Sequence, residues 1–137
     1  MVNHAYRQHR LLGWTRIDML VALYDAALLK LEQAMQAGND GHALTARRRS
    51  LEALRLVAQL NAGIARQYGN LADNLANLFH FVSLRILADD GAGLADAHRI
   101  LETLRAGFSE IRDEAVELES EGVIPQIEEM HACNRTA

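Results

Sequence analysis

The sequence predicts an all-α protein, an antiparallel up-and-down four-helix bundle with a mobile N-terminal arm. Half of the 137 residues are hydrophobic, whereas only 5% are aromatic and a single residue is proline. Apolar residues recur at steps of three and four in four segments, which is the spacing of one helix face. β-Branched residues are too scattered to form strands. Short gaps separate the four segments, and short connections favour antiparallel neighbours, so we expect one helical domain.

The first helix is expected over about 16–37, after an arm at 1–14 that has no sustained period. Thr15 is its expected N-cap, and Gly38 is the expected glycine just beyond its last turn. A second apolar flank predicts that the first half of this helix lies in the middle of the bundle. The main stripe contains Ile17, Leu20, Val21, Tyr24, Leu28, Leu31 and Met35, and the flank contains Met19, Leu23 and Ala26.

Three further helices are expected over about 42–66, 71–88 and 94–120. The last has the most regular period, and Leu104 at its centre is expected to be buried. The tail at 122–137 has apolar residues on one side, which is compatible with a short C-terminal helix of one or two turns. The regular stripe contains Leu94, Ala97, Leu101, Leu104, Phe108, Ile111, Ala115 and Leu118.

Charge and cysteine content favour a cytoplasmic protein without a nucleic-acid or membrane partner. The formal net charge is −4, and the arginines at 47–49 are too few for a convincing nucleic-acid patch. The single cysteine, Cys133, cannot form an internal disulfide, which suits the cytoplasm. The N terminus lacks the pattern of a secretory signal, and the longest dense apolar stretch, at 19–24, is too short to span a bilayer.

The sequence contains no motif for catalysis or for a cofactor. A di-metal site in a helical bundle requires two Glu-x-x-His pairs, whereas this chain has one, Glu128 with His131, in the tail. Zinc motifs and a glycine-rich phosphate loop are absent from the sequence. We therefore expect no metal, no cofactor and no enzymatic activity.

The third segment carries more apolar surface than one bundle face needs. In addition to its core stripe, Phe81, Leu84 and Leu87 form a second face. This face is either buried on two sides, covered by the arm, exposed as a groove for an amphipathic client helix, or used as a seam for self-association. Asp25, within the most apolar helix, also has two interpretations: an ion pair at the bundle edge with an arginine of the second helix, or a polar anchor in a binding groove.

Two stretches resemble the flagellar export chaperones of the FliS family. Residues 15–28 read TRIDMLVALYDAAL and resemble the family's Leu-Tyr-Asp-Gly-Ala-Leu core, with Ala26 in place of the glycine. Residues 69–82 read GNLADNLANLFHFV and resemble its Asn-Leu-x-x-Leu-aromatic motif. Further matches are Leu101, Leu104, Arg105 and Phe108 in the last helix and Tyr6 in the arm.

The resemblance implies a cytoplasmic chaperone that binds the disordered C-terminal segment of flagellin and prevents its polymerisation before flagellar type III export. Other export components are further expected partners. The alternatives are a self-associating helical adaptor with a different client, and a metal-binding or enzymatic bundle. We expect Tyr6, Leu11 and Leu12 of the arm to cover the client groove in the free protein. The expected groove residues are Tyr24, Asp25, Leu75, Leu78, Phe79, Phe81 and Leu84.

Overall fold

A computed structural model describes the backbone over residues 4–67 and 69–120. Side chains are described within 16–66 and 73–114, and at Asn70 and Glu117. The expected C-terminal turns at 122–137 lie outside the described residues.

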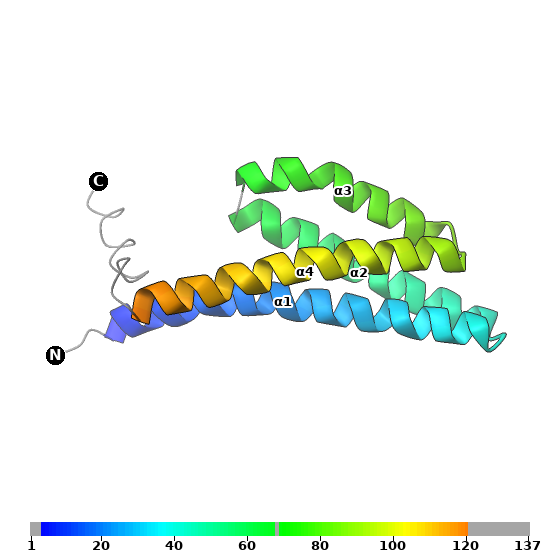
Figure 1. Cartoon of the computed structure of the whole chain (residues 1–137), viewed down its shortest axis with the longest axis horizontal. Coiled ribbons are helices and arrows are strands. Elements are labelled where there is room, and N and C mark those ends of the chain that lie inside the picture. Colours follow the sequence, from blue (N-terminus) through cyan, green and yellow to red (C-terminus); the bar gives the residue numbers. More distant parts are fainter. Residues whose placement is uncertain (1–3, 68, 121–137) are drawn as a thin grey trace.

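Four helices form an up-and-down bundle, which confirms the predicted fold class (Figure 1). Going around the bundle, α1 packs against α2 and α4, and α3 packs against α2 and α4, so α1 and α3 occupy opposite corners. The described residues contain no strand. The helices are α1 (His4–Asn39), α2 (Ala43–Gln67), α3 (Gly69–Leu87) and α4 (Gly91–Ser120).

The structure differs from the sequence-based expectation at the N terminus. The backbone of residues 4–14 continues α1 instead of forming a separate arm, and Thr15 lies inside the helix instead of capping it. Figure 1 shows these first turns, in dark blue, extending α1 without a break. Glycine and threonine lower helix propensity by about 1 kcal/mol or less, so Gly13 and Thr15 do not end a helix whose neighbours on both sides are helical.

The turn between α1 and α2 ends α1 at Asn39, two residues later than expected. The His42 N–H donates to the Ala37 carbonyl at 2.8 Å, and the Gly41 N–H donates to the Gly38 carbonyl at 3.2 Å. This pair of bonds is a Schellman motif, and its left-handed residue is Gly41, with φ of 79°. The glycine beyond the last turn is therefore Gly41, whereas Gly38 is helical.

The turn between α3 and α4 contains a capping aspartate. The Gly93 N–H donates to Asp90 Oδ1 at 2.6 Å, which makes Asp90 the N-cap of α4. Asp89 precedes it in the left-handed region, with φ of 57°. Because this cap lies before Gly91, α4 begins three residues earlier than the apolar stripe predicted.

The core runs along the bundle axis and receives side chains from all four helices. Tyr24 and Phe108 pack together in it, with ring centroids 5.7 Å apart. On α4, Leu101 is fully buried, whereas Leu104 packs against the core from its edge and is only partly buried. The core consists of Leu20, Tyr24, Ala27, Leu31, Ala34, Ala53, Val57, Leu60, Ile64, Phe79, Val82, Ile86, Leu94, Ala97, Leu101 and Phe108.

Candidate functional site

The structure does not bring the predicted groove residues together. Tyr24 is fully buried and Phe79 is 2% exposed, so both side chains belong to the core and not to a groove surface. A buried side chain on the core stripe cannot reach a client while the bundle is closed. Asp25 lies on α1, at the corner of the bundle opposite α3. The other four residues lie on α3: Leu75 and Leu78 are partly buried, and Phe81 and Leu84 are exposed.

Asp25 forms an ion pair at the bundle edge, as one of its two interpretations expected, but its partner belongs to α4. Arg105 Nε donates to Asp25 Oδ1 at 2.8 Å. Similar pairs recur every seven residues along α1 and α4, as two antiparallel helices in constant register require. The row consists of two ion pairs, Asp18 with Arg112 and Asp25 with Arg105, and of a hydrogen-bond contact between Glu32 Oε1 and His98 Nε2 at 3.3 Å. Such exposed pairs stabilise a fold by about 1 kcal/mol or less each. Their main effect is therefore on the register of α1 against α4, and their contribution to the free energy of unfolding is small.

The Tyr24 hydroxyl has no hydrogen-bond partner among the described residues. Burial raises the pKa of this phenol, because the phenolate is poorly solvated in the core. An unsatisfied buried polar group destabilises a fold by about 1–3 kcal/mol. Tyr24 therefore contributes through its ring, and its hydroxyl opposes burial.

The second apolar face of α3 is exposed in the described structure. Phe81, Leu84 and Leu87 are 45%, 52% and 45% exposed, and we call these three residues the α3 row. The prediction of a surplus apolar face on this helix is thus confirmed. The side chains of Tyr6, Leu11 and Leu12 lie outside the described ones, so a covering role for them stays a prediction.

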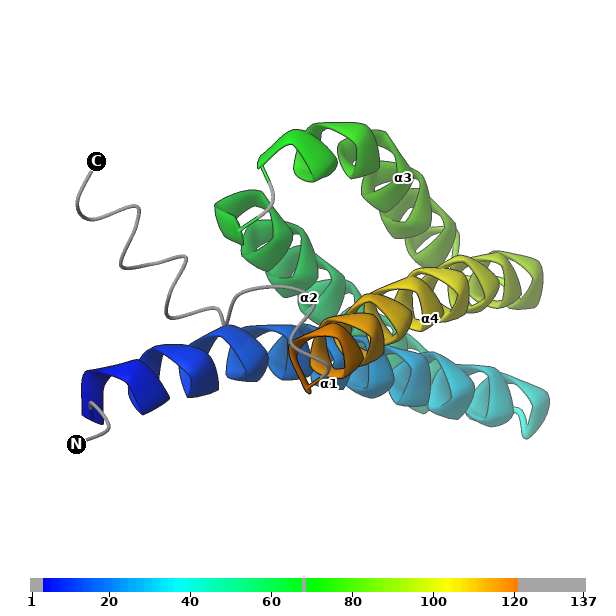
Figure 2. The same cartoon turned by 60° about the vertical axis from the view of Figure 1, so that its left-hand side comes forward.

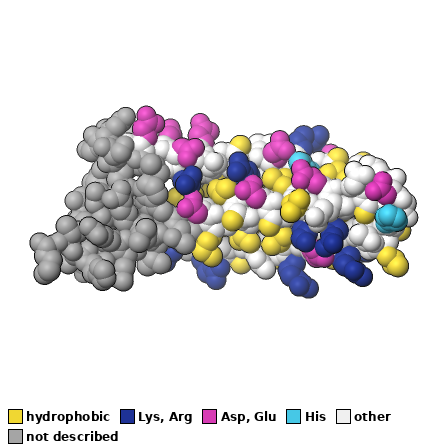
Figure 3. Space-filling view, turned by 90° about the horizontal axis from the view of Figure 1, so that it is seen from below, with side chains coloured by type: hydrophobic (Ala, Val, Ile, Leu, Met, Phe, Trp, Pro, Cys, Tyr) yellow, Lys and Arg dark blue, Asp and Glu magenta, His cyan; other side chains and the backbone are white. Residues whose placement is uncertain are grey.

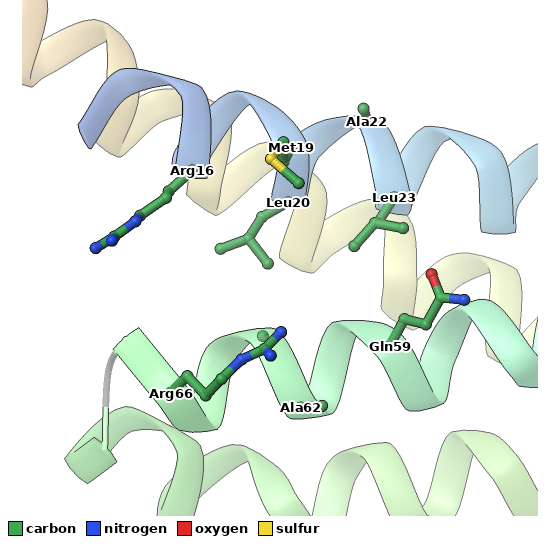
Figure 4. A pocket seen from close by; sticks show the side chains of 9 residues that line it. Arg16, Met19, Leu20, Ala22, Leu23, Gln59, Ala62 and Arg66 are labelled. Atoms are coloured by element: carbon green, nitrogen blue, oxygen red, sulfur yellow. The ribbon is translucent and has the colours of Figure 1, made fainter. Parts of the chain in front are cut away.

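A second apolar surface, which the sequence analysis missed, is a groove between α1 and α2 (Figure 4). Its volume is about 860 Å³, and we call it the α1–α2 groove. Its lining from α1 comprises Arg16, Met19, Leu20, Ala22 and Leu23, and its lining from α2 comprises Gln59, Ala62, Gly63 and Arg66.

The groove forms because two helices diverge where their facing residues are small. An ion pair joins the two helices, with Lys30 Nζ of α1 2.7 Å from Glu52 Oε2 of α2. The hydrogen bond from Lys30 lowers the pKa of the Glu52 carboxyl, and a second one from Arg49 lowers it further. Figure 2 shows α2 and α1 separating with distance from the turn that joins them. Towards their separated ends α2 presents Ala62, whose short side chain does not fill the space, whereas the Leu20 side chain of α1 already packs against Gly63, close to where a Cβ atom would lie.

The apolar flank of α1 is the signal that could have revealed the groove. We expected Met19 to be buried in the middle of the bundle, but it is 59% exposed at the groove. The expectation was wrong because the flank faces small residues of α2 across a gap. An apolar flank on one helix opposite a small residue such as Ala62 on the next helix is therefore a sequence sign of an open groove.

Within the described residues, no group of three or more His, Cys, Asp and Glu side chains could hold a metal ion. The same part of the chain has no helix that is both long and apolar enough to cross a membrane.

Comparison with known families gives one match. The family described as flagellar protein FliS matches residues 1–115, which span α1, α2, α3 and most of α4. The chain belongs to the FliS family. No curated protein and no solved structure matches it. The FliS family comprises flagellar export chaperones and not enzymes, so this chain is a flagellar export chaperone.

Family membership gives the two apolar surfaces of this FliS-family chain a common interpretation. A chaperone needs exposed apolar area that recognises a client before the client assembles. The α3 row supplies exposed side chains on a convex helix, whereas the α1–α2 groove supplies a concave surface. Concave apolar surfaces bury more of a bound side chain, so the groove is the stronger candidate for a client anchor.

Replacing Tyr24 by phenylalanine is expected to stabilise this FliS-family chain by up to about 1 kcal/mol, because the ring packing remains and the unsatisfied hydroxyl is removed. The raised pKa gives a second readout. A pKa that is higher in the folded state provides stability below the unfolded pKa of about 10, and this stability is lost at higher pH. Urea unfolding at neutral and alkaline pH should show a smaller alkaline loss for Tyr24→Phe. A destabilised variant at neutral pH would mean that the hydroxyl is hydrogen-bonded.

Proposed function

We propose that this chain is a cytoplasmic chaperone that binds the disordered C-terminal segment of flagellin and prevents premature polymerisation before flagellar type III export. Family membership supports an export chaperone. The observation that carries the finer proposal is the α1–α2 groove, an apolar concavity of about 860 Å³ that no described side chain fills. A helical segment of a client fits this kind of surface.

The mechanism follows from the physical chemistry of helix-in-groove binding. A disordered segment with apolar residues on one helical face becomes ordered when it docks, and those residues are then removed from water against Met19, Leu20 and Leu23. The entropy of ordering lowers the affinity, which suits a client that must later be released. Binding prevents polymerisation because the same apolar face of the client is needed for packing in the filament.

Filling the groove is expected to remove client binding. Ala62→Trp places a large side chain in the groove, and the loss of one or two client anchors should weaken binding by about 100-fold. Ala58→Trp is the matched control, because Ala58 is an exposed alanine one turn earlier on α2 that does not line the groove. Calorimetry with the isolated C-terminal segment of flagellin measures both variants.

The outcomes separate the groove from the rest of the proposal. Equal binding by Ala62→Trp and the wild-type chain would exclude the groove as the client site. Leu84→Glu then tests the α3 row. Leu44→Glu is its control, because Leu44 is also an exposed leucine, at 86%, but lies at the start of α2 and outside the α3 row. If Leu84→Glu changes light scattering of the free chain and not client binding, the α3 row is a seam for self-association. No binding of flagellin by the wild-type chain at tens of micromolar would contradict the proposed function.

The N-terminal residues are proposed to cover client-binding surface in the free chain, through Tyr6, Leu11 and Leu12. The backbone of residues 4–14 continues α1. For the covering role, this segment must therefore either add its side chains to the apolar surface of α1 or unwind from α1 and fold back. Deletion of residues 1–14 should then raise the binding of an apolar fluorescent dye. Unchanged dye fluorescence, with the helical content of residues 15–137 retained, would refute the covering role.

A further inference from the structure

Two arginines lie at one end of the α1–α2 groove, one on each helix. Arg16 lies fourteen residues before Lys30 on α1, and Arg66 lies fourteen residues after Glu52 on α2, so the register of the Lys30–Glu52 pair brings them to the same level. Figure 4 shows both side chains extending into the space between the helices. Both side chains are cationic, so an anion that enters this end of the groove is attracted by a positive charge from each helix.

These arginines differ from most other arginines because they have no acidic partner among the described residues. Six others are paired with carboxylates: Arg47, Arg49, Arg85, Arg99, Arg105 and Arg112. Figure 3 shows a face where hydrophobic side chains gather along the middle, with Lys and Arg on the lower edge and Asp and Glu mainly on the upper edge. Within the part of the chain that the structure describes, Arg16 and Arg66 are cations without an acidic partner that line an apolar groove.

The apolar part of the groove sets the size of its occupant. From Arg16 to Leu23 the lining extends along eight residues of α1, a rise of about 10 Å or two helical turns. An amphipathic helix lying there can place two or three apolar side chains in the groove before it reaches the arginines. Arginine binds carboxylates through two parallel hydrogen bonds, so this end favours Asp or Glu.

We infer that the client segment seated in the α1–α2 groove is an amphipathic helix whose apolar anchors are flanked by a side-chain carboxylate, held between Arg16 and Arg66. This inference rests on the proposed function and specifies the chemistry of the client at that site. A long polyanion such as nucleic acid fits less well, because the groove is apolar and the chain carries a net charge of −4.

The test is a charge reversal at the end of the groove, measured with the flagellin C-terminal segment. Arg16→Glu/Arg66→Glu should weaken binding at least about tenfold, because the client carboxylate then faces two acids. Arg48→Glu/Arg55→Glu is the matched control, because it makes the same change in net charge. Both of these α2 arginines are exposed, lack an acidic partner among the described residues, and do not line the groove. Circular dichroism should show that both variants keep their helices.

A charge swap then identifies the partner carboxylate. Each Asp or Glu of the flagellin segment is replaced by Lys in turn, and one replacement should restore binding to the Arg16→Glu/Arg66→Glu variant. Equal losses in the groove and control variants, or no rescue by any replacement, would overturn the inference while flagellin binding by the wild-type chain stands. If the wild-type chain does not bind the segment, the proposed function and this inference both fail.

Discussion

Replacing Leu101 by alanine is expected to lower the free energy of unfolding by about 2–5 kcal/mol. Leu101 is fully buried on α4, within a core that includes the Tyr24 and Phe108 rings. Truncation removes apolar contacts and leaves a cavity that the neighbouring helices cannot fully close. Urea unfolding followed by circular dichroism measures the change, and the slope with denaturant should stay constant if both states keep their compactness.

Leu104→Ala, three residues further along α4, is the matched control. Its side chain is only partly buried, although the sequence placed it at the centre of the most regular stripe. The same replacement at an edge position leaves a depression open to water, so its effect should be smaller than that of Leu101→Ala. Equal losses at both positions would mean that α4 is rotated about its axis relative to the described packing.

Gly93→Ala is expected to lower the free energy of unfolding by about 2–3 kcal/mol, because it overpacks the turn between α3 and α4. A Cβ atom at Gly93 would overlap the backbone carbonyl oxygen of Arg85 and lie 3.0 Å from Asp90 Oδ1, the capping atom. The carbonyl is part of α3 and cannot rotate away as a side chain could. The start of α4 must therefore shift, which weakens both the cap and the contact between the two helices.

Gly107→Ala in the same helix separates this steric effect from helix propensity. A Cβ atom at Gly107 would have nothing within 4 Å among the described residues. Alanine favours the helix over glycine by about 0.5–1 kcal/mol, so Gly107→Ala should be stabilising. Thermal unfolding of the two variants should shift in opposite directions. Stabilisation by Gly93→Ala would show that α3 and α4 do not approach each other closely.

The two apolar surfaces differ in how far they are exposed to water and in whether charged residues lie beside them. The α3 row leaves apolar area in contact with water, which tends to promote self-association when no client covers it. The α1–α2 groove hides part of its apolar area between helices and has two cations at its end, so as the proposed client site it would select by charge as well as by apolar shape. A client that used only apolar contacts would gain little from Arg16 and Arg66.

The sequence by itself determined the helical class, the existence of four helices and the resemblance to the FliS family. These properties depend on local information: the period of apolar residues identifies a helix face, and short gaps between segments require antiparallel neighbours. The surplus apolar face of α3 was predicted for the same reason, since Phe81 and Leu84 lie outside the stripe that fills the core.

Only the tertiary structure decided which apolar residues are core and where a groove remains. Tyr24 and Met19 both belong to apolar parts of one helix, but one is fully buried and the other is 59% exposed, because the first faces the bundle axis and the second faces small residues of α2. Likewise, the sequence left Asp25 either an ion pair with an arginine of the second helix or a place in a binding groove, and the packing of α1 against α4 made its ionic partner Arg105. Periodicity gives the face of a helix, whereas the neighbour and its distance are set by how all four helices pack.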